Sequence, residues 1–406
     1  MRLPSREGAD VVRLPRQGPT TPSAPADGVG GRRDRPVRVL VVATVQHPLD
    51  ARVCAREIGA LLAAGHQVTY AAPFHDTGVT PPAGVRPIDV PRAHGRHRAA
   101  AFRAARRVLR RQAAGHDVVL VHGPEAMMAA AGLKHPCIVW DVHEDTGAAL
   151  GMKPWLPAAL RPVAARGVDS AEAFAARRYR LLIAEEAYAA RFPEADPVLV
   201  PNSPVVPSQV LPTARGRAVY VGDLSVARGA EEIIEVGRML APDIVVEVIG
   251  AARSPVAERL SAAASAGWIE WLGYLPNDAA LARVEGACAG LALLHDEPNY
   301  RHSMPTKLYE YLARGVPYVS TPLPLARRLA EDSGGGIIVP FGDAPAAADA
   351  VRMLNDDDVR RQEMASSGRA WVLAHANWER DGDRFVRQLE DWAAAGARGA
   401  PGGPAH

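Results

Sequence analysis

Lys307 is the residue of this chain whose position suggests chemistry most directly. Only three of the 47 basic residues are lysines, and Lys307 lies at the predicted start of a helix, in MPTKLYEYLARG (304–315). Its ammonium acts as a movable point charge, and Glu310 falls on the same helical face three residues later. Two interpretations stay open: a site where the cation meets a diphosphate and the carboxylate meets a pair of hydroxyls, or an ordinary surface ion pair.

Arg228 supplies a second cation in the same half of the chain. It lies in YVGDLSVARG (220–229), between a predicted strand and a predicted helix. Gly222 lets a ligand approach the backbone closely, and the start of a helix favours anions. Together with Lys307, Arg228 places two cations in separate loops that follow strands. This pair predicts an anion clamp.

Polar residues also follow the first predicted strand, in the other half. His47, Asp50 and Arg52 lie in a loop without G-x-G-x-x-G, so it is not an ordinary dinucleotide site. We predict that these three side chains face the acceptor side of a cleft. The alternatives are that Asp50 caps the following helix and that Arg52 is solvated.

A histidine ends a later strand of this half, in WDVHED (140–145). His143 can donate to a sugar hydroxyl or help to remove an acceptor proton, and the alternative is a satisfied structural histidine. Glu144 is predicted beside it on the acceptor side, and His122 closes the neighbouring strand. In the second half, Tyr274 and Leu275 form either the slot for a base or an ordinary turn.

Bulk properties narrow the class of protein. A chain of 406 residues with 48% hydrophobic and 23% charged residues suggests about two soluble domains, and a net charge of +2 gives no reason to expect nucleic acid. The three cysteines are isolated and never in a metal-type spacing, which favours a reducing compartment. Neither a signal peptide nor an apolar run of about 18–20 residues is present, so we expect a cytoplasmic protein.

Strand-like and helix-like segments alternate along the chain, which predicts doubly wound parallel sheets in two Rossmann-like domains that face each other across a cleft. Residues 96–111 contain seven arginines and are predicted to form a solvated amphipathic helix, with peripheral contact to an anionic membrane surface as the alternative. The expected organisation is a disordered leader (1–36), an acceptor-side domain (37–205), a donor domain (206–376), a final helix that packs back on the first domain (377–395) and a flexible tail (396–406).

With these residues placed, the chain resembles the GT-B glycosyltransferases, and in particular the retaining family-four or "group 1" type, over about residues 37 to 393. The resemblance implies transfer of a sugar from a nucleoside-diphosphate sugar to a hydroxyl or other nucleophile (EC 2.4 class), with retention and with neither metal nor cofactor. Four segments in sequential order carry it: HPLDARVCAREIGALLAAGHQVT, WDVHED, YVGDLSVARG and SMPTKLYEYLARGVPYVST.

The resemblance also implies roles for residues. Arg228 and Lys307 would hold the donor diphosphate and stabilise the leaving nucleotide, and Gly222 would let the phosphates approach. Glu310 would bind the ribose hydroxyls. His143 would contact the donor sugar near the reacting carbon.

The chain departs from the family pattern at one position. The family commonly has two glutamates eight positions apart; Glu310 is the second, but His302 stands in place of the first. We therefore expect the loop of residues 299–303 to contact the donor sugar through backbone amides and Ser303, and we expect Thr306 to lie in the donor site as well. The resemblance places Tyr274 and Leu275 in the base pocket.

Two other functions share this architecture. A sugar-nucleotide epimerase would turn over the donor alone, without an acceptor. A non-catalytic relative would bind the nucleotide sugar and transfer nothing.

Overall fold

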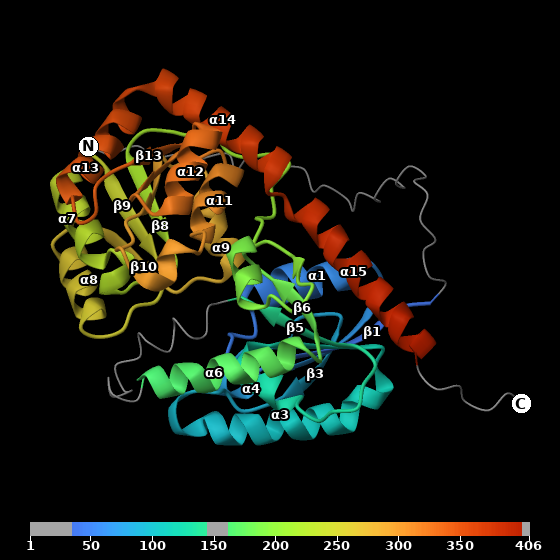
Figure 1. Cartoon of the computed structure of the whole chain (residues 1–406). Coiled ribbons are helices and arrows are strands. Elements are labelled where there is room, and N and C mark those ends of the chain that lie inside the picture. The colour runs from blue at the N-terminus through green and yellow to red at the C-terminus, as the bar shows by residue number, and fades with distance from the viewer. Residues whose placement is uncertain (1–34, 144–160, 400–406) are drawn as a thin grey trace, which may run out of the picture. The chain divides into compact units, whose positions relative to one another are not determined.

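The computed structural model describes residues 35–143 and 161–399, and these form two parallel sheets with helices packed on them (Figure 1). The prediction of two Rossmann-like domains is confirmed. The first sheet has the order β3-β2-β1-β4-β5-β6-β7. Its strands are β1 (Arg38–Ala43), β2 (Gln67–Ala72), β3 (Val85–Asp89), β4 (Val118–His122), β5 (Ile138–Val142), β6 (Arg180–Ile183) and β7 (Val198–Leu199).

The second sheet has six parallel strands in the order β10-β9-β8-β11-β12-β13, and each lies where the sequence indicates a strand. In both sheets the strand order reverses once, between β1 and β4 and between β8 and β11, and ligands of open parallel sheets bind at such points. The strands are β8 (Arg217–Val221), β9 (Val245–Ile249), β10 (Glu270–Gly273), β11 (Ala289–Ala292), β12 (Tyr318–Ser320) and β13 (Gly336–Ile338).

Two strands of the first sheet were not anticipated from the sequence. β3 contains Pro87 and is largely exposed at the sheet edge, so it lacks the continuous apolar run of a central strand. β7 has only two residues and lies just before the proline-rich linker. Edge strands of this kind carry little pattern for a sequence to reveal.

Helices and helical turns connect the strands. Those of the first domain are η1 (Ala51–Ile58), α1 (Gly59–Ala63), α2 (Phe74–Thr77), η2 (Gly95–His97), α3 (Arg98–Gln112), η3 (Ala113–Gly115), α4 (Gly123–Ala129), α6 (Arg161–Ala176) and η5 (Glu186–Arg191). Those that follow β8 are η6 (Val226–Arg228), α7 (Ala230–Leu240), α8 (Val256–Ser265), α9 (Asn277–Ala282), α10 (Pro298–Arg301), α11 (Thr306–Ala313), α12 (Pro324–Ser333), α13 (Ala344–Asp356), α14 (Asp358–His375) and α15 (Trp378–Gly399).

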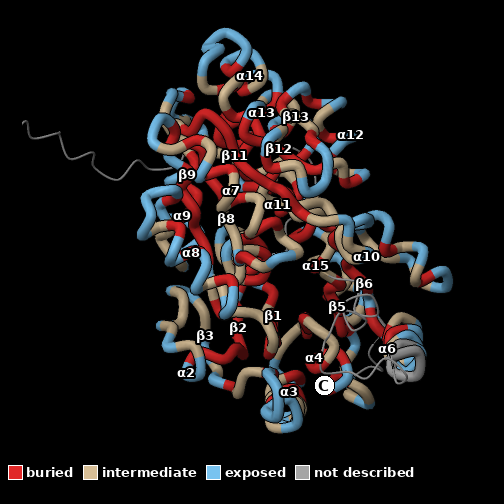
Figure 2. Tube along the Cα trace, turned by 90° about the vertical axis from the view of Figure 1, so that its left-hand side faces the viewer, coloured by how far each residue is buried: buried red, intermediate tan, exposed pale blue. Residues whose placement is uncertain are grey.

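The central strands are buried on both faces, and this explains their unbroken apolar sequence. Along β1, Leu40 and Val42 belong to one hydrophobic core, whereas Val39 and Val41 belong to the core on the opposite face. Side chains alternate between the faces of a strand, so helices on both faces require apolar residues at every position. Figure 2 shows the strands buried along most of their length.

The C-terminal helix α15 packs with the first sheet although it follows the second sheet in sequence. Trp378, Phe385 and Leu389 share a core with Val39 and Val41 of β1. Figure 1 shows α15 running beside α1. Helix α15, the last described element, therefore contributes apolar side chains to the core of the first domain.

Helix α3 carries the arginine-rich segment. Its buried side is formed by Ala101, Ala105 and Leu109, while Arg103, Arg107, Arg110 and Arg111 are exposed. This is the amphipathic arrangement predicted for a solvated helix, and contact with a membrane surface stays a prediction. None of the helices within the described residues has the length and hydropathy that crossing a membrane requires.

Tyr311 fixes helix α11 onto the second sheet. Its hydroxyl accepts a hydrogen bond from the Val221 amide (3.1 Å) and donates one to the Leu291 carbonyl (3.0 Å), which joins α11 to β8 and β11. The ring lies directly on Gly290, where an added Cβ would be 2.3 Å from it. Because Lys307 precedes Tyr311 by one helical turn, this anchor also sets the position of the ammonium.

Replacing Tyr311 with Phe should therefore lower the free energy of unfolding by about 1–3 kcal/mol, since a buried amide and carbonyl lose their partner. Urea denaturation measures the loss. Tyr309→Phe is the matched control, because the described residues give the Tyr309 hydroxyl no hydrogen bond and its ring stacks on Trp371. Equal stability of the two variants would show that the Tyr311 hydroxyl does not anchor the helix.

Candidate functional site

One cavity of about 390 Å³ gathers seven of the residues predicted for a site. They come from the loops that follow β5, β8 and β11 and from the start of α11, so both domains contribute. The seven are His143, Gly222, Arg228, Ser303, Thr306, Lys307 and Glu310. The cavity lies where the carboxyl ends of the strands predict a ligand.

Lys307 and Arg228 converge on this cavity from separate elements. Lys307 is the second residue of α11, and its Nζ lies 3.6 Å from the centroid of the Tyr220 ring. Arg228 ends the turn η6, and its Nη1 donates to the Asp223 carbonyl (3.2 Å). Within the described residues neither cation forms a close ion pair with a carboxylate. The anion clamp predicted from the sequence is therefore geometrically available.

The two cations oppose each other electrostatically. Burial and then the Arg228 guanidinium hold the pKa of the Lys307 ammonium well below its usual range, and Asp223 offsets this only in part. A like charge nearby disfavours the charged form of a lysine, whereas an anion favours it. An anion with two or more negative charges would thus be stabilised here by charges that the protein itself does not neutralise.

The backbone at Gly222 leaves room for a ligand to approach the end of β8. Its φ of +125° is unfavourable for other residues, and a Cβ added to it would lie 3.3 Å from the Lys307 Nζ. A side chain at this position would push the ammonium away from the strand end. The glycine therefore keeps the backbone of the β8 loop open to a ligand.

Glu310 lies one turn after Lys307 on α11 and is held from both sides. Its Oε1 accepts from Arg56 Nη2 (2.7 Å) and its Oε2 accepts from Arg314 Nη1 (2.8 Å). Arg56 comes from η1 in the first domain, so this ion pair joins the two domains at the cavity wall. Two guanidinium partners fix the orientation of the carboxylate.

His143 follows β5 and reaches the cavity from the first domain. Its Nε2 lies 2.5 Å from Asp141 Oδ2 and 2.9 Å from His122 Nδ1. The sequence left open whether this histidine is structural or functional. It is tied to a buried network on one side and lines the cavity on the other.

The structure places the residues that were predicted for the acceptor side in different environments. Asp50 caps η1 by accepting from the amides of Arg52 and Val53, as its alternative interpretation stated. Arg52 is neither solvated nor in the cavity: it is 4% exposed and donates to both oxygens of Asp141, at 2.8 and 2.6 Å. Glu144 lies outside the described residues.

His47 and Tyr274 lie close together outside the cavity lining. Their ring centroids are 5.7 Å apart, and Tyr274 is 55% exposed. Leu275 packs against the core beneath α11 and also does not line the cavity. Their roles at the acceptor side and in a base pocket stay predictions.

His122, Asp141 and His143 bring three atoms that can bind a metal within 4.8 Å of one another. Arg52 already donates to both Asp141 oxygens, so a cation would compete there with a buried guanidinium. This charge makes the cluster a poor metal site. That the site works without a metal stays a prediction.

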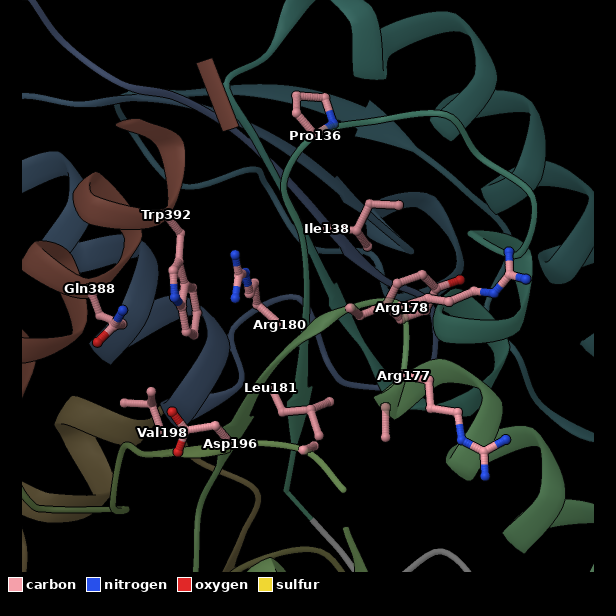
Figure 3. Close-up of a pocket in the computed structure, with 13 residues that line it drawn as sticks. Pro136, Ile138, Arg177, Arg178, Arg180, Leu181, Asp196, Val198, Gln388 and Trp392 are labelled. Carbon is pink, nitrogen blue, oxygen red and sulfur yellow. The ribbon is translucent and has the colours of Figure 1, made fainter. Parts of the chain in front are cut away.

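A second cavity of about 440 Å³ lies near the amino ends of β5 and β6 and beside α15 (Figure 3). Its arginines are largely engaged elsewhere: Arg177 pairs with Glu194 at 2.9 Å, and Arg178 lies over the Phe174 ring. Parallel sheets bind ligands at the opposite, carboxyl ends of their strands. We assign no chemistry to this cavity.

Comparisons with known proteins agree with this geometry. Residues 215–357 match the family model described as "Glycosyl transferases group 1". These residues include the β8 loop, Arg228, Lys307 and Glu310. The second domain of this chain is therefore similar in sequence to the group 1 glycosyltransferases.

Individual relatives are similar over shorter or more distant matches. A phosphatidyl-myo-inositol mannosyltransferase of Mycobacterium leprae is 33% identical over 91 residues, which are 22% of this chain and only 24% of that protein. Both partial matches are to glycosyltransferases, which is the class that the sequence resemblance implied.

Solved structures share the fold. Sucrose-phosphate synthase from Thermosynechococcus elongatus aligns with a TM-score of 0.70 and 15% identity, over 89% of this chain and all of that chain. Anabaena Alr3699/HepE, solved in complex with UDP-glucose, aligns with a TM-score of 0.65 and 12% identity, over 87% of this chain and all of that one. At these identities the likeness shows the GT-B fold alone.

Two residues of the network and the cavity wall lie in the sequence segments quoted above but were not predicted as site residues. Arg56 lies four residues after Arg52, so the helical period places both on one face. Asp141 lies two residues before His143, so the strand period directs both to the same side of the sheet. Those spacings were visible in the sequence, but the partners of Arg56 and Asp141 were not.

Lys307 should make anion binding depend on pH in a defined direction. Its charge is fully present only below its pKa, which is lowered in the free protein and rises when an anion binds. The affinity that Lys307 contributes should therefore fall as the pH rises through the lowered pKa. At low pH, Lys307→Ala should weaken the binding of inorganic pyrophosphate about 10- to 100-fold.

Titration calorimetry from about pH 6 to pH 10 measures this ratio of dissociation constants, variant over wild type. The ratio also cancels the titration of pyrophosphate itself. When the effect of Lys307→Ala is measured in the Arg228→Ala background, the ratio should fall at higher pH. The Arg228 guanidinium is one cause of the lowered pKa of Lys307, and this variant removes it. A ratio that stays constant across the range would show that the pKa of Lys307 is not lowered.

Proposed function

We propose that this protein transfers a sugar from a nucleoside-diphosphate sugar to a hydroxyl or other nucleophile of an acceptor, with retention at the anomeric carbon and without a metal. The observation that carries the proposal is that Lys307 and Arg228 converge on a cavity that also contains Glu310, and that neither cation forms an ion pair with a carboxylate of residues 35–143 or 161–399. Two cations suit a diphosphate, and a carboxylate one helical turn away suits a pair of ribose hydroxyls.

In the proposed reaction the bond between the anomeric carbon and the phosphate oxygen breaks, and its electron pair leaves with the diphosphate. Lys307 and Arg228 stabilise the charge that develops on this leaving group. The acceptor hydroxyl forms the new bond from the same face and gives its proton to the departing phosphate oxygen. His143 contacts the sugar from the first domain.

The cavity supports retention without a covalent enzyme intermediate. Among the described residues that line it, the only carboxylate is Glu310, and both of its oxygens already accept from arginines. A double displacement would need a carboxylate free to attack the anomeric carbon. Attack on the same face, assisted by the leaving phosphate, needs no such group.

Binding of the donor is tested by thermal shift with ADP, CDP, GDP and UDP and with their sugar conjugates. One nucleotide class should stabilise the wild type, by about 2.7 kcal/mol at a hundred times its dissociation constant. Lys307→Ala should lose most of this shift. Lys134→Ala, the same change at an exposed lysine, should keep it. If no nucleotide shifted the melting temperature of the wild type, the donor site would be refuted.

Catalysis is tested by the release of nucleoside diphosphate from the preferred donor, with water or added sugars as acceptors. Arg228→Ala should slow this release about 10²–10³-fold, because it removes one stabilising group from the leaving diphosphate. Arg238→Ala is the matched control, since Arg238 is exposed and pairs only with Glu235 on α7.

The product identifies the reaction. A glycosidic product or free sugar with the anomeric configuration of the donor, seen by proton NMR, is expected. Conversion of the donor into another nucleotide sugar without release of diphosphate would instead indicate an epimerase. Tight binding with no turnover would indicate a non-catalytic relative.

A further inference from the structure

The ring of His143 is held by one of its two nitrogens. Nε2 lies within hydrogen-bond distance of Asp141 Oδ2 (2.5 Å) and His122 Nδ1 (2.9 Å). A ring nitrogen engaged by two buried groups is not free for a ligand. The nitrogen left for the cavity is therefore Nδ1.

Asp141 cannot turn away from this contact. Arg52 donates to its Oδ2 from Nε (2.8 Å) and to its Oδ1 from Nη2 (2.6 Å), a bidentate pair. Arg52 is itself fixed by the Val200 carbonyl, 2.8 Å from its Nη1. Asp141 is 1% exposed, so the carboxylate has no solvent to compete for it.

Two further members of the network have shifted pKa values. Burial and the neighbouring Asp141 carboxylate raise the pKa of Glu57 well above its usual range, and burial lowers the pKa of His122. Arg52 and Asp141 form the bidentate ion pair of the cluster. This ion pair favours a negative Asp141 beside His143, as its lowered pKa also indicates.

The hydrogen bonds of the network then agree with one assignment of protons. Asp141 can only accept, so Nε2 of His143 carries the hydrogen. His122 Nδ1 lies 2.9 Å from Nε2 of His143 and 3.3 Å from Asp141 Oδ2. Because the shorter contact is to the nitrogen that carries the hydrogen, we assign Nδ1 as an acceptor and place the hydrogen of His122 on Nε2, facing Glu57 Oε2 at 3.5 Å. His122 and Asp141 are register partners on β4 and β5, so the sheet itself sets this geometry.

We propose that Asp141 and His122 are positioning residues that hold His143 in the Nε2–H tautomer, so that Nδ1 faces the cavity as a hydrogen-bond acceptor for a ligand hydroxyl. The inference deepens the proposed function and rests on it, because the hydroxyl would belong to the donor sugar or the acceptor. Asp141 and His122 do not touch the ligand. They act through the ring of His143.

The tautomer is observable without any activity. In two-dimensional ¹⁵N–¹H spectra of the histidine-labelled full chain, the ring signals of His143, assigned with His143→Gln, should show a protonated Nε2 and an unprotonated Nδ1. His122, assigned in the same way with His122→Gln, should show the same tautomer. Finding the hydrogen of His143 on Nδ1 in the wild type would overturn the proposal, and this measurement needs no variant of Asp141.

Asp141→Asn should reverse the tautomer of His143. Nη2 of Arg52 would keep the amide oxygen as its acceptor in the place of Oδ1, so the amide NH₂ would take the place of Oδ2, lose the hydrogen bond from Arg52 Nε and require an acceptor at Nε2 of His143. The hydrogen would move to Nδ1, and diphosphate release from the donor should fall about 10²–10⁴-fold, as when the orienting aspartate of a serine protease is changed to asparagine. Unchanged spectra and unchanged release in a folded variant would contradict the inference.

A double-mutant cycle separates positioning from general loss of structure. In the His143→Ala background, Asp141→Asn should have little further effect on release, because the residue through which it acts is gone. Additive losses would instead show that Asp141 supports the fold and not the ring. Pyrophosphate binding at Lys307 and Arg228 should be unchanged in all three variants, which shows that the second domain remains folded.

The two hypotheses fail in different ways. If no nucleotide sugar binds to the wild type but His143 is the Nε2–H tautomer, the proposed function is wrong and the network stands. If donors bind and turn over but the hydrogen lies on Nδ1, the positioning inference is wrong and the proposed function stands.

Discussion

The central constraint on this structure is that two cations share a cavity in which no carboxylate of the described residues forms an ion pair with either of them. Lys307 lies over the Tyr220 ring and Arg228 donates to the Asp223 carbonyl; burial and then the Arg228 guanidinium lower the pKa of the Lys307 ammonium. Such an arrangement costs stability in the free protein, and it persists because rigid elements impose it. Helix α11 is fixed by the Tyr311 hydroxyl, and Gly222 leaves the space that the ammonium occupies. An anionic ligand bound beside Lys307 and Arg228 would offset the unfavourable interaction between these two charges.

The two domains treat their buried charges in opposite ways. In the first domain Arg52 donates hydrogen bonds to Asp141, the Val200 carbonyl and Asn202 Oδ1, so removing it from water is compensated in place. In the second domain the cations at the cavity are left open to a ligand. The hydrogen bonds of the Arg52–Asp141 network fix the side chains in it, whereas Lys307 and Arg228 remain able to bind an anionic ligand. In the proposed function, the first domain orients His143 and the second domain recognises the anion.

Much of the fold and part of the site could be predicted from the sequence, and the reason is physical. Strands covered on both faces need unbroken apolar runs, and residues that follow such strands meet at one edge of the sheet, which placed His143, Gly222 and Arg228 near Lys307. The partners of buried side chains could not be predicted in this way. Arg52 meets Asp141 across 89 residues of sequence, and Arg56 meets Glu310 across 254. Periodicity shows that a residue lies on a given face, but it does not show what that face will meet.

The contact between Arg56 and Glu310 has a further meaning in the proposed reaction. Each carboxylate oxygen has two lone pairs, and the two arginines engage one on each oxygen. The second lone pair of each oxygen remains for a pair of hydroxyls, so the arginines orient the carboxylate without exhausting it. Because Arg56 belongs to the first domain and Glu310 to α11, a nucleoside bound at Glu310 would experience the position of the first domain directly. In the proposed reaction, the carboxylate would thus join ligand recognition in one domain to the placement of His143 by the other.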